Sequence, residues 1–218
     1  MTAYLDGADL SYEIIVVDDG STDGTAEIVR GRPRACAAVR LLRNESNRGK
    51  GYSVRRGMQE ARGELILFTD ADNSTPIEEL EKLLAKVEGG ADMAIGSRGL
   101  PESVLEVRQP AYREYMGKMF NLVVRLLMGL PFRDTQCGFK LLRRDVARDL
   151  ASRQTLDGWA FDVELLHLAR RKRGYEVVEV PVRWINSPRT TLNAATDSLG
   201  MLREVLRVKW QDLRGRYG

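Results

Sequence analysis

The sequence predicts an α/β fold in which a mostly parallel sheet carries helices on both faces. Short apolar runs alternate with longer stretches of helical periodicity, and acidic residues come directly after two of the apolar runs. No repeat, low-complexity segment or linker divides the chain, and 218 residues are enough for one sizeable core. We therefore expect a single domain over residues 1–218, ending in a basic amphipathic helix over residues 198–218.

Four apolar runs have the length and composition of buried strands. They are Glu13–Val17, Val39–Leu42, Leu65–Phe68 and Asp92–Ile95. Helical periodicity predicts helices over residues 23–31, 51–62, 76–88 and 111–129. The third of these helices has a defined start, because Thr75 can cap it, Pro76 suits its first turn and Glu78 completes a capping box.

Composition and charge exclude several classes of protein. The chain is 43% apolar and 30% charged, as in an ordinary soluble protein, and its net charge of +3 is too small to indicate nucleic-acid binding. The first ten residues lack the basic region and apolar run of a signal peptide, so none is expected. The most apolar stretch, residues 120–132, contains Arg125 and Pro131 and falls short of the ~20 apolar residues of a membrane span.

The cysteines and the single histidine offer no catalytic or zinc pattern. Cys36 and Cys137 lie far apart without metal-ligand spacing, which predicts buried or unreactive thiols in a reducing compartment. His167 lies within a run of leucines, so we expect a packed histidine and no Ser-His-Asp triad.

Acidic residues follow two predicted strands at the point where each strand ends. Asp18 and Asp19 follow the first strand, and Asp70 and Asp72 follow the third. Ligands bind at the carboxyl ends of the strands in sheets of this kind, so we expect these acids at one rim. Acids before glycine also form turns. The two interpretations weigh equally for Asp18 and Asp19, whereas function is favoured for the second pair.

Paired carboxylates are typical ligands of a hard divalent cation, which leaves positions open to water or phosphate. Asp70 and Asp72 are therefore predicted to bind Mg²⁺ or Mn²⁺ bridging a diphosphate. Asp18 or Asp19 could accept hydrogen bonds from a base or ribose. The segment NRGKG (residues 47–51) begins a helix and could present backbone N–H groups and Lys50 to anions, although a solvated turn is equally compatible. It is not the GxxxxGK[ST] loop of ATPases.

Six segments together resemble a known family. EIIVVDDGSTDGT, NRGKGYSVRRGM, LFTDADNSTP, AIGSR, DTQCGFKLL and GWAFDVELL occur in the order found in inverting glycosyltransferases of the GT-A fold. The chain looks most like the dolichyl-phosphate β-glucosyltransferases and next most like the polyprenyl-phosphate mannosyltransferases. The resemblance extends from Ser11 to about Trp210, and the late NSPRT segment also points to the glucosyl branch.

The resemblance implies transfer of a hexose, with inversion, from a nucleotide-sugar donor such as UDP-glucose to a polyprenyl phosphate such as dolichyl phosphate. It implies nucleotide contacts at Asp18 and Asp19 with Lys50 nearby, metal binding at Asp70 and Asp72, acceptor-phosphate binding at Arg98 and Arg113, and a sugar pocket at Gln136 and Asp162. Asp72, Asp162, Arg98 and Arg113 are the expected catalytic residues. Ser74 and Gly117 replace a glutamine and a serine found in some relatives, which weakens the expectation beyond the acids and arginines.

Two regions suggest contact with a membrane surface at the cytoplasmic side. Residues 108–144 carry eight Lys or Arg and two acids, a net charge of +6. The C-terminal stretch places leucines at helical spacing beside basic residues. Its leucines are Leu199, Leu202, Leu206 and Leu213, and its basic residues are Arg203, Arg207, Lys209, Arg214 and Arg216. Packing on the domain is favoured for each helix taken alone, and the acceptor implied by the resemblance favours a peripheral membrane contact for the whole chain.

Two alternatives to a glucosyltransferase stay open: a mannosyltransferase using GDP-mannose, and a non-catalytic nucleotide or lipid binder. A nucleotidyltransferase is disfavoured because its Gly-rich loop with Lys or Arg is missing after the first strand. The family normally has a further strand and helix before the DDGS strand, and the twelve residues before Glu13 cannot hold that unit. We expect an N-terminally incomplete domain with an unpaired edge on its first strand, whose upstream extension would raise stability and UDP affinity.

Overall fold

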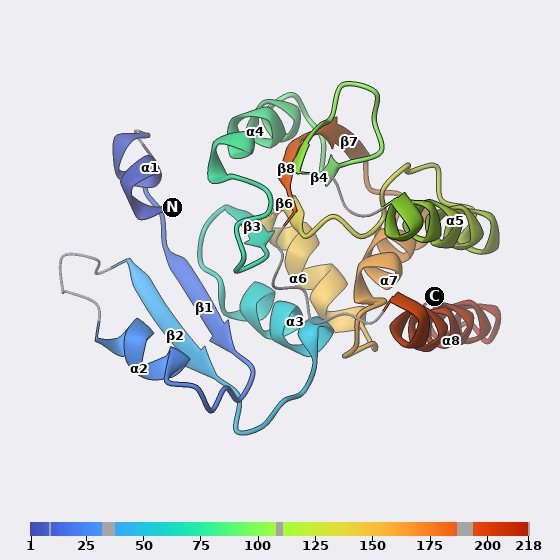
Figure 1. Ribbon diagram of the computed structural model, residues 1–218, viewed down its shortest axis with the longest axis horizontal. Coiled ribbons are helices and arrows are strands. Elements are labelled where there is room, and N and C mark those ends of the chain that lie inside the picture. The colour runs from blue at the N-terminus through green and yellow to red at the C-terminus, as the bar shows by residue number, and fades with distance from the viewer. Residues whose placement is uncertain (9, 32–37, 108–110, 187–193, 218) are drawn as a thin grey trace.

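The computed structural model describes residues 1–8, 10–31, 38–107, 111–186 and 194–217. The strands are β1 (Ile14–Asp18), β2 (Val39–Arg43), β3 (Leu65–Thr69), β4 (Met93–Ser97), β5 (Val104–Val107), β6 (Phe139–Arg143), β7 (Val177–Pro181) and β8 (Arg183–Ile185). The helices are α1 (Thr2–Gly7), α2 (Thr25–Arg30), α3 (Lys50–Glu60), η2 (Ile77–Glu79), α4 (Leu80–Glu88), α5 (Ala111–Met128), α6 (Arg144–Arg153), α7 (Phe161–His167), η3 (Leu168–Lys172) and α8 (Ala194–Leu213). All four predicted strands and all four predicted helices are present, with ends shifted by a few residues (Figure 1).

The strands form a four-stranded sheet in the order β3-β6-β4-β7 and two separate pairs, β1-β2 and β5-β8. The pairs β1-β2, β4-β7 and β5-β8 are parallel, so most pairings are parallel, but they are divided among three sheets and do not form the single sheet that was predicted. Strand β6, which the periodicity did not predict, runs antiparallel between β3 and β4. Its register places Phe139 opposite Thr69 and Lys140 opposite Phe68. Residues just before β6 therefore meet the acids that follow β3.

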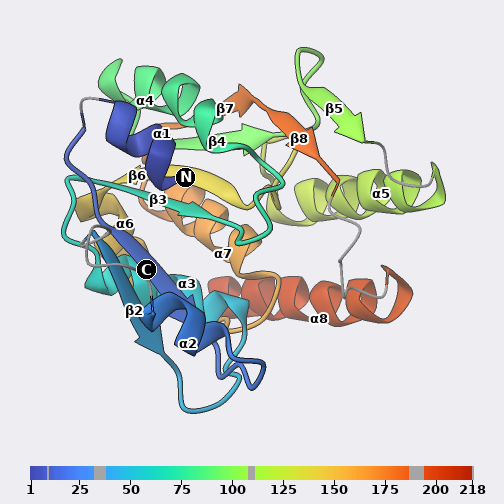
Figure 2. The same ribbon diagram turned by 60° about the vertical axis from the view of Figure 1, so that its left-hand side comes forward.

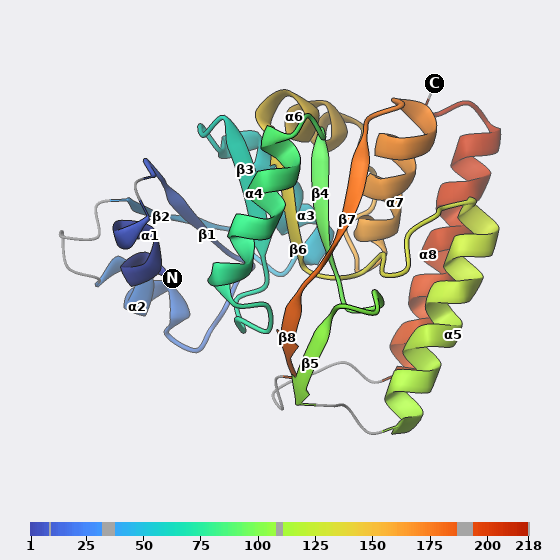
Figure 3. The ribbon, with the colours of Figure 1, turned by 90° about the horizontal axis from the view of Figure 1, so that it is seen from above.

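Helices cover both faces of the four-stranded sheet, as predicted (Figures 2 and 3). Side chains alternate between faces along each strand. In β4, Ala94 packs in one apolar cluster with α1 and α4, while Met93 and Ile95 pack in another with α3, α6 and α7. All five residues of β4 are buried. This two-sided burial makes the four-stranded sheet the rigid centre of the molecule.

The β1-β2 pair lies beside this centre and is less buried. Four of the five residues in each of its strands are only partly buried. Helix α3 contacts both β1 and β3, yet within the part of the chain that the structure describes no strand pairs with the second edge of β1. The expected unpaired edge is thus observed among these residues.

The predicted capping box before α4 is wrong. The turn η2 begins after Pro76 without a side-chain cap, and the Thr75 hydroxyl instead lies 3.9 Å from the Cys137 sulfur. Thr75 is buried, so its hydroxyl pairs with this internal partner and does not cap the turn. Glu78 lies 3.8 Å from Arg183, on β8.

The C-terminal helix α8 is confirmed, but its leucine stripe does not pack on the domain as favoured above. Val205 and Val208 make the buried face, whereas Leu199, Leu206 and Leu213 are 64%, 48% and 76% exposed. Helices α5 and α8 lie side by side at one edge of the molecule (Figure 3). Exposed apolar side chains on α5 include Tyr112, Tyr115, Met119, Leu122 and Leu126. None of the helices described here is long and apolar enough to cross a membrane.

Candidate active site

Asp70 and Asp72 lie in the turn that follows β3. The Asp70 backbone N–H donates to the Gly138 carbonyl at 3.1 Å, just before β6. A Cβ at Gly138 would collide with the Asp70 carboxylate, so only glycine leaves room for it. Asp72 accepts a hydrogen bond from the Ser74 N–H at 2.9 Å, and Asn73 between them has φ 55°. Backbone groups before and after the turn therefore fix the positions of the Asp70 and Asp72 carboxylates.

Lys50, the first residue of α3, provides the positive charge beside these acids. Its Nζ lies 2.6 Å from Asp70 Oδ1 and about 5–6 Å from the rings of Trp159 and Phe161. Burial disfavours the charged amine, but Asp162 and Asp70 outweigh that effect and raise the pKa of Lys50. Lys50 thus connects the NRGKG segment to the second acid pair, while Asn47 and Arg48 at the start of the segment are exposed to solvent.

Of the two acids at the end of β1, Asp19 holds that same segment. Asp19 accepts hydrogen bonds from the backbone N–H groups of Arg48 and Gly49 at 2.9 and 2.8 Å. Asp18 is buried and accepts from the Ser21 N–H at 2.9 Å, and Ser21 together with Arg43 lowers the pKa of Asp18. Residues 48–50 connect one acid of each pair, because they contact Asp19 at one end and Asp70 at the other.

A buried ion pair lies beneath the site. Asp162 at the start of α7 is 2% exposed, and its carboxylate contacts the Nζ of the fully buried Lys140 on β6. Lys140 also donates to the Cys137 carbonyl at 2.6 Å and lies 5.1 Å from the Phe68 ring. Burial raises the pKa of Asp162 despite the opposing charges of Lys140 and Lys50. Two lysines and the acids Asp70 and Asp162 thus form one charged group.

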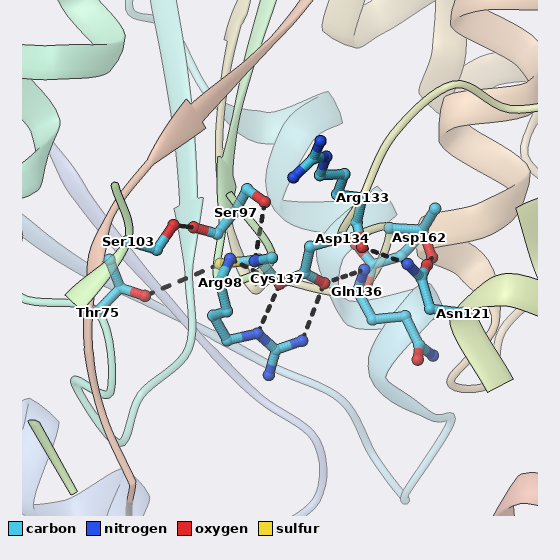
Figure 4. Close-up of polar contacts among 12 residues, drawn as sticks. Thr75, Ser97, Arg98, Ser103, Asn121, Arg133, Asp134, Gln136, Cys137 and Asp162 are labelled. Atoms are coloured by element: carbon cyan, nitrogen blue, oxygen red, sulfur yellow. Dashed lines mark hydrogen bonds and ion pairs between the residues drawn. The ribbon is translucent and has the colours of Figure 1, made fainter. Parts of the chain in front are cut away.

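Arg98, after β4, is held by Asp134 in a two-pronged contact (Figure 4). Its Nε and Nη2 donate to the two carboxylate oxygens at 2.6 and 3.0 Å, and its backbone N–H donates at 3.0 Å. Burial opposes ionisation of Asp134, but the Arg98 guanidinium lowers its pKa from 3.8 to about 2. The remaining guanidinium donors of Arg98 are not used by Asp134, so they are available to a further anion.

Two other predicted residues have less defined surroundings. Gln136 lies beside Asp134, whose carboxylate accepts its backbone N–H at 3.1 Å (Figure 4). The side-chain amide of Gln136 lies 3.4 Å from the Met201 sulfur. Arg113 is in α5, but its side chain, like Cys36, Arg108 and residues 187–190 of NSPRT, lies outside what the structure describes.

His167 is buried, as predicted, 3.0 Å from Asp212. Cys137 is buried, and burial raises its pKa to about 11.

Asp70 and Asp72 fit a hard divalent cation only if a bound ligand helps to complete the coordination shell of the cation. No group of three or more His, Cys, Asp or Glu side chains gathers into a metal site among the residues that the structure describes. Asp70 and Asp72 nevertheless supply two hard carboxylates, and Asp70 keeps 37% of its side chain exposed. Mg²⁺ is commonly bound by one or two carboxylates with substrate phosphates and water completing its shell. The residues therefore fit a cation that binds together with a diphosphate.

Three residues of this site were not predicted: Lys140, Asp134 and Gly138. All lie in or beside the DTQCGFK segment, which was noted only for its resemblance. Their partners are 22 to 68 residues away, so no local spacing identifies them. A lysine within a strand whose neighbours are all apolar was the available signal, because a buried charge requires a partner.

The sheet order, the helices on both faces and the acids after β1 and β3 define a GT-A-type α/β fold. The chain belongs to glycosyl transferase family 2, whose family model matches residues 4–151. Its curated relatives include dolichyl-phosphate beta-glucosyltransferases from Trichomonas vaginalis, Dictyostelium discoideum and Homo sapiens, which are 40%, 36% and 34% identical to it. The matches cover 81%, 94% and 95% of this chain but only 53%, 64% and 66% of those proteins. The predicted resemblance is confirmed, and the chain spans between half and two thirds of the length of these relatives.

Solved structures share the fold at lower identity. Glucosyl-3-phosphoglycerate synthase from Mycobacterium tuberculosis, in complex with Mn²⁺, uridine diphosphate and glucosyl-3-phosphoglycerate, matches with a TM-score of 0.62 and 24% identity, over 94% of this chain and 69% of that one. Mannosyl-3-phosphoglycerate synthase from Rubrobacter xylanophilus matches with a TM-score of 0.64 and 22% identity, over 98% and 67%. These likenesses confirm the predicted GT-A-type fold.

Proposed function

We propose that this chain transfers glucose from UDP-glucose to a polyprenyl phosphate, such as dolichyl phosphate, with inversion at the anomeric carbon. The observation that carries the proposal is the contact of Lys50 with Asp70, two residues before Asp72, at the end of β3. It combines one cation and two hard carboxylates at a single point, as a metal-bridged diphosphate requires. The names of the curated relatives support the sugar and the acceptor.

Asp70 and Asp72 would hold Mg²⁺ or Mn²⁺. The bound ion would offset the charge that develops on the departing diphosphate. Lys50 adds a second positive charge on the same side, and the hydrogen bonds of Asp19 keep the first turn of α3 in place. On the strength of the family resemblance, Asp18 and Asp19 are proposed to contact the base or ribose of the nucleotide.

The acceptor phosphate needs no general base. A phosphate monoester has a second pKa of about 6 and is largely ionised at neutral pH. Its oxygen attacks the anomeric carbon while the bond from that carbon to the UDP oxygen breaks on the opposite face, which inverts the configuration. Arg98, held by Asp134, and Arg113 would receive this phosphate, and Gln136 would contact the sugar.

Asp162 is proposed to orient the site and not to accept a proton. It is buried and ion-paired with Lys140, so it already has a cation as partner. Asp162→Asn should lower turnover because Lys140 loses its counterion, and the pH profile of the variant should remain as flat as that of the wild type. Turnover measured from pH 6 to pH 9 tests this. A steep rise with pH in the variant alone would make Asp162 a base.

The exposed apolar side chains of α5 and α8 support a peripheral contact with a membrane surface, where a polyprenyl phosphate resides. Leu126 on α5 and Leu213 on α8 are 75% and 76% exposed, and basic residues lie on the same helices. Residues of this kind bind the interface between lipid headgroups and acyl chains. The helices would bring the acceptor to Arg98 without crossing the bilayer.

UDP release from UDP-glucose, with and without dolichyl phosphate, tests the proposed reaction. We expect release that depends on the acceptor and on Mg²⁺ or Mn²⁺, and a lipid-linked glucose as product. Release of GDP from GDP-mannose in place of UDP would establish the mannosyltransferase alternative. Binding of UDP without turnover of either donor would indicate a non-catalytic binder.

A further inference from the structure

A cavity of about 510 Å³ lies between α3, the end of α6, the segment after it and the end of α8, and it shares no residue with the candidate active site. Four arginines line it: Arg55, Arg153, Arg207 and Arg216. Asp157 is the only acidic residue among its lining residues. The lining therefore carries a net charge of +3, equal to that of the whole chain. An excess of positive charge around one cavity attracts an anion.

Two of the arginines are held in position by acids. Arg55 Nη2 lies 2.7 Å from Asp157 Oδ1, and Arg153 Nε lies 3.0 Å from Asp149 Oδ1. Each guanidinium has five N–H donors, so these contacts leave donors for a ligand. Arg207 on α8 and Arg216 after it are exposed, and no acidic partner is found for either among the described ion pairs. The cavity thus combines two oriented guanidinium groups with two that lack a counterion.

The walls of the cavity are fixed by buried contacts. The fully buried Glu164 accepts hydrogen bonds from the N–H groups of Thr155 and Leu156 at 3.0 and 2.8 Å. The hydroxyl of the buried Tyr217 donates to the same carboxylate at 2.6 Å and so anchors the chain next to Arg216. A cavity that is already formed loses little entropy when a ligand binds.

One lining residue also has an unused acceptor. Gln154 is 5% exposed, and its side-chain N–H groups donate to the carbonyls of Gly51 and Leu156. Its Oε1 is buried and has no hydrogen-bond partner among the described residues, so this side chain fixes the wall of the cavity. The Asp157 side chain is 43% exposed, and its carboxylate can accept a hydrogen bond from a hydroxyl group of a ligand.

We propose that this cavity binds a phosphate ester that carries hydroxyl groups. The arginines bind the phosphate, because the guanidinium group matches phosphate geometry, while the exposed Asp157 carboxylate accepts from a hydroxyl. Two sources share this chemistry: a soluble polyol phosphate, and the headgroup of a hydroxylated phospholipid such as phosphatidylglycerol. Arg207 and the exposed leucines lie on the same helix, α8. A soluble ester and a lipid headgroup can therefore both reach this cavity.

The test measures binding of glycerol 3-phosphate by calorimetry in EDTA, which removes divalent ions from Asp70 and Asp72. We expect saturable binding that excess UDP does not displace. The double variant Arg207→Gln, Arg216→Gln should bind at least tenfold more weakly. Arg203→Gln, which removes a charge from α8 outside the cavity, should change the affinity less than twofold. Melting curves of all variants check that the fold is kept.

Binding to lipid vesicles distinguishes a lipid headgroup from a soluble phosphate ester. Flotation with phosphatidylcholine vesicles, with and without phosphatidylglycerol, is compared for the same variants. Loss of phosphatidylglycerol-dependent flotation in the double variant alone identifies a headgroup site, and unchanged flotation with weakened glycerol phosphate binding identifies a soluble ligand. The proposal is overturned if neither probe binds, or if Arg203→Gln weakens binding as much as the double variant does.

Discussion

The β1-β2 pair and the four-stranded sheet begin from similar sequences and end in different environments. The run before Asp18 and the run before Asp70 are both apolar and both end in acids. In the β1-β2 pair the strands are mostly half-buried, and the acids hold backbone N–H groups. In the four-stranded sheet β3 is mostly half-buried as well, but it pairs with β6 beside the fully buried β4, and Asp70 faces a lysine at a partly exposed turn. An apolar run followed by acids therefore predicts a strand end, while the neighbours decide whether the acids are structural or available to a ligand.

Exchanging the acids tests this difference most directly. Asp70→Asn should reduce turnover by about 10²–10³, because about 3–4 kcal/mol of transition-state stabilisation is lost with the charge that holds the metal. Asp72→Asn should act similarly. Asp19→Asn removes an acceptor from the Gly49 N–H, so it should raise KM for the donor more than it lowers kcat. UDP-release kinetics measure all three, and near-normal turnover in both Asp70 and Asp72 variants would refute the metal assignment.

Matched core substitutions sharpen the comparison of the strands. Ile95→Ala in β4 should lower the free energy of unfolding by about 3 kcal/mol, because it leaves a cavity at a fully buried position. Ile15→Ala in β1 should cost less than half as much, since Ile15 is only partly buried at the margin of the same apolar cluster. Urea denaturation gives both values. Equal losses would mean that β1 contributes to the core as fully as β4 does.

The ion pair between Arg98 and Asp134, after β4, should make the stability of the fold depend on pH. The native pKa of Asp134 is about 2, below its ordinary 3.8, so ionised Asp134 stabilises the fold above pH 4, and the effect is lost as pH falls through 2. Asp134→Asn should lower the free energy of unfolding by about 2 kcal/mol at pH 6. The gap between wild type and variant should close towards pH 2. Urea titrations at several pH values measure it, and a gap independent of pH would contradict the assignment.

The smallest effect on stability is expected at the outer face of α8. Leu213→Ser should change the free energy of unfolding by less than about 0.5 kcal/mol, because Leu213 is 76% exposed. If the α5 and α8 faces meet a membrane, the same substitution should reduce flotation with phosphatidylcholine vesicles. Val208→Ser, on the buried face of the same helix, is the matched control and should destabilise the fold. Unchanged flotation of a folded Leu213→Ser protein would remove this residue from the membrane contact.

Local patterns in the sequence predicted the helices and strands and the edge of the sheet at which the acids lie. Apolar runs identified β1 to β4, helical periodicity identified α2 to α5 and α8, and the acids after two strands indicated the candidate site. These features depend on residues within a few positions of one another, so backbone geometry and side-chain periodicity are enough to predict them. The order of six short segments also predicted the family.

Tertiary structure decided the features that join distant residues. Strand β6 lies antiparallel between β3 and β4, and only this placement brings Gly138 against Asp70 and Lys140 against Asp162. The pairing of Arg98 with Asp134 spans 36 residues. The leucines of α8 were predicted on a helix, but Val205 and Val208 made its buried face, because a helix with apolar residues on two sides can pack by either one. Burial and charge pairing depend on which surfaces meet, and sequence spacing carries no information on that.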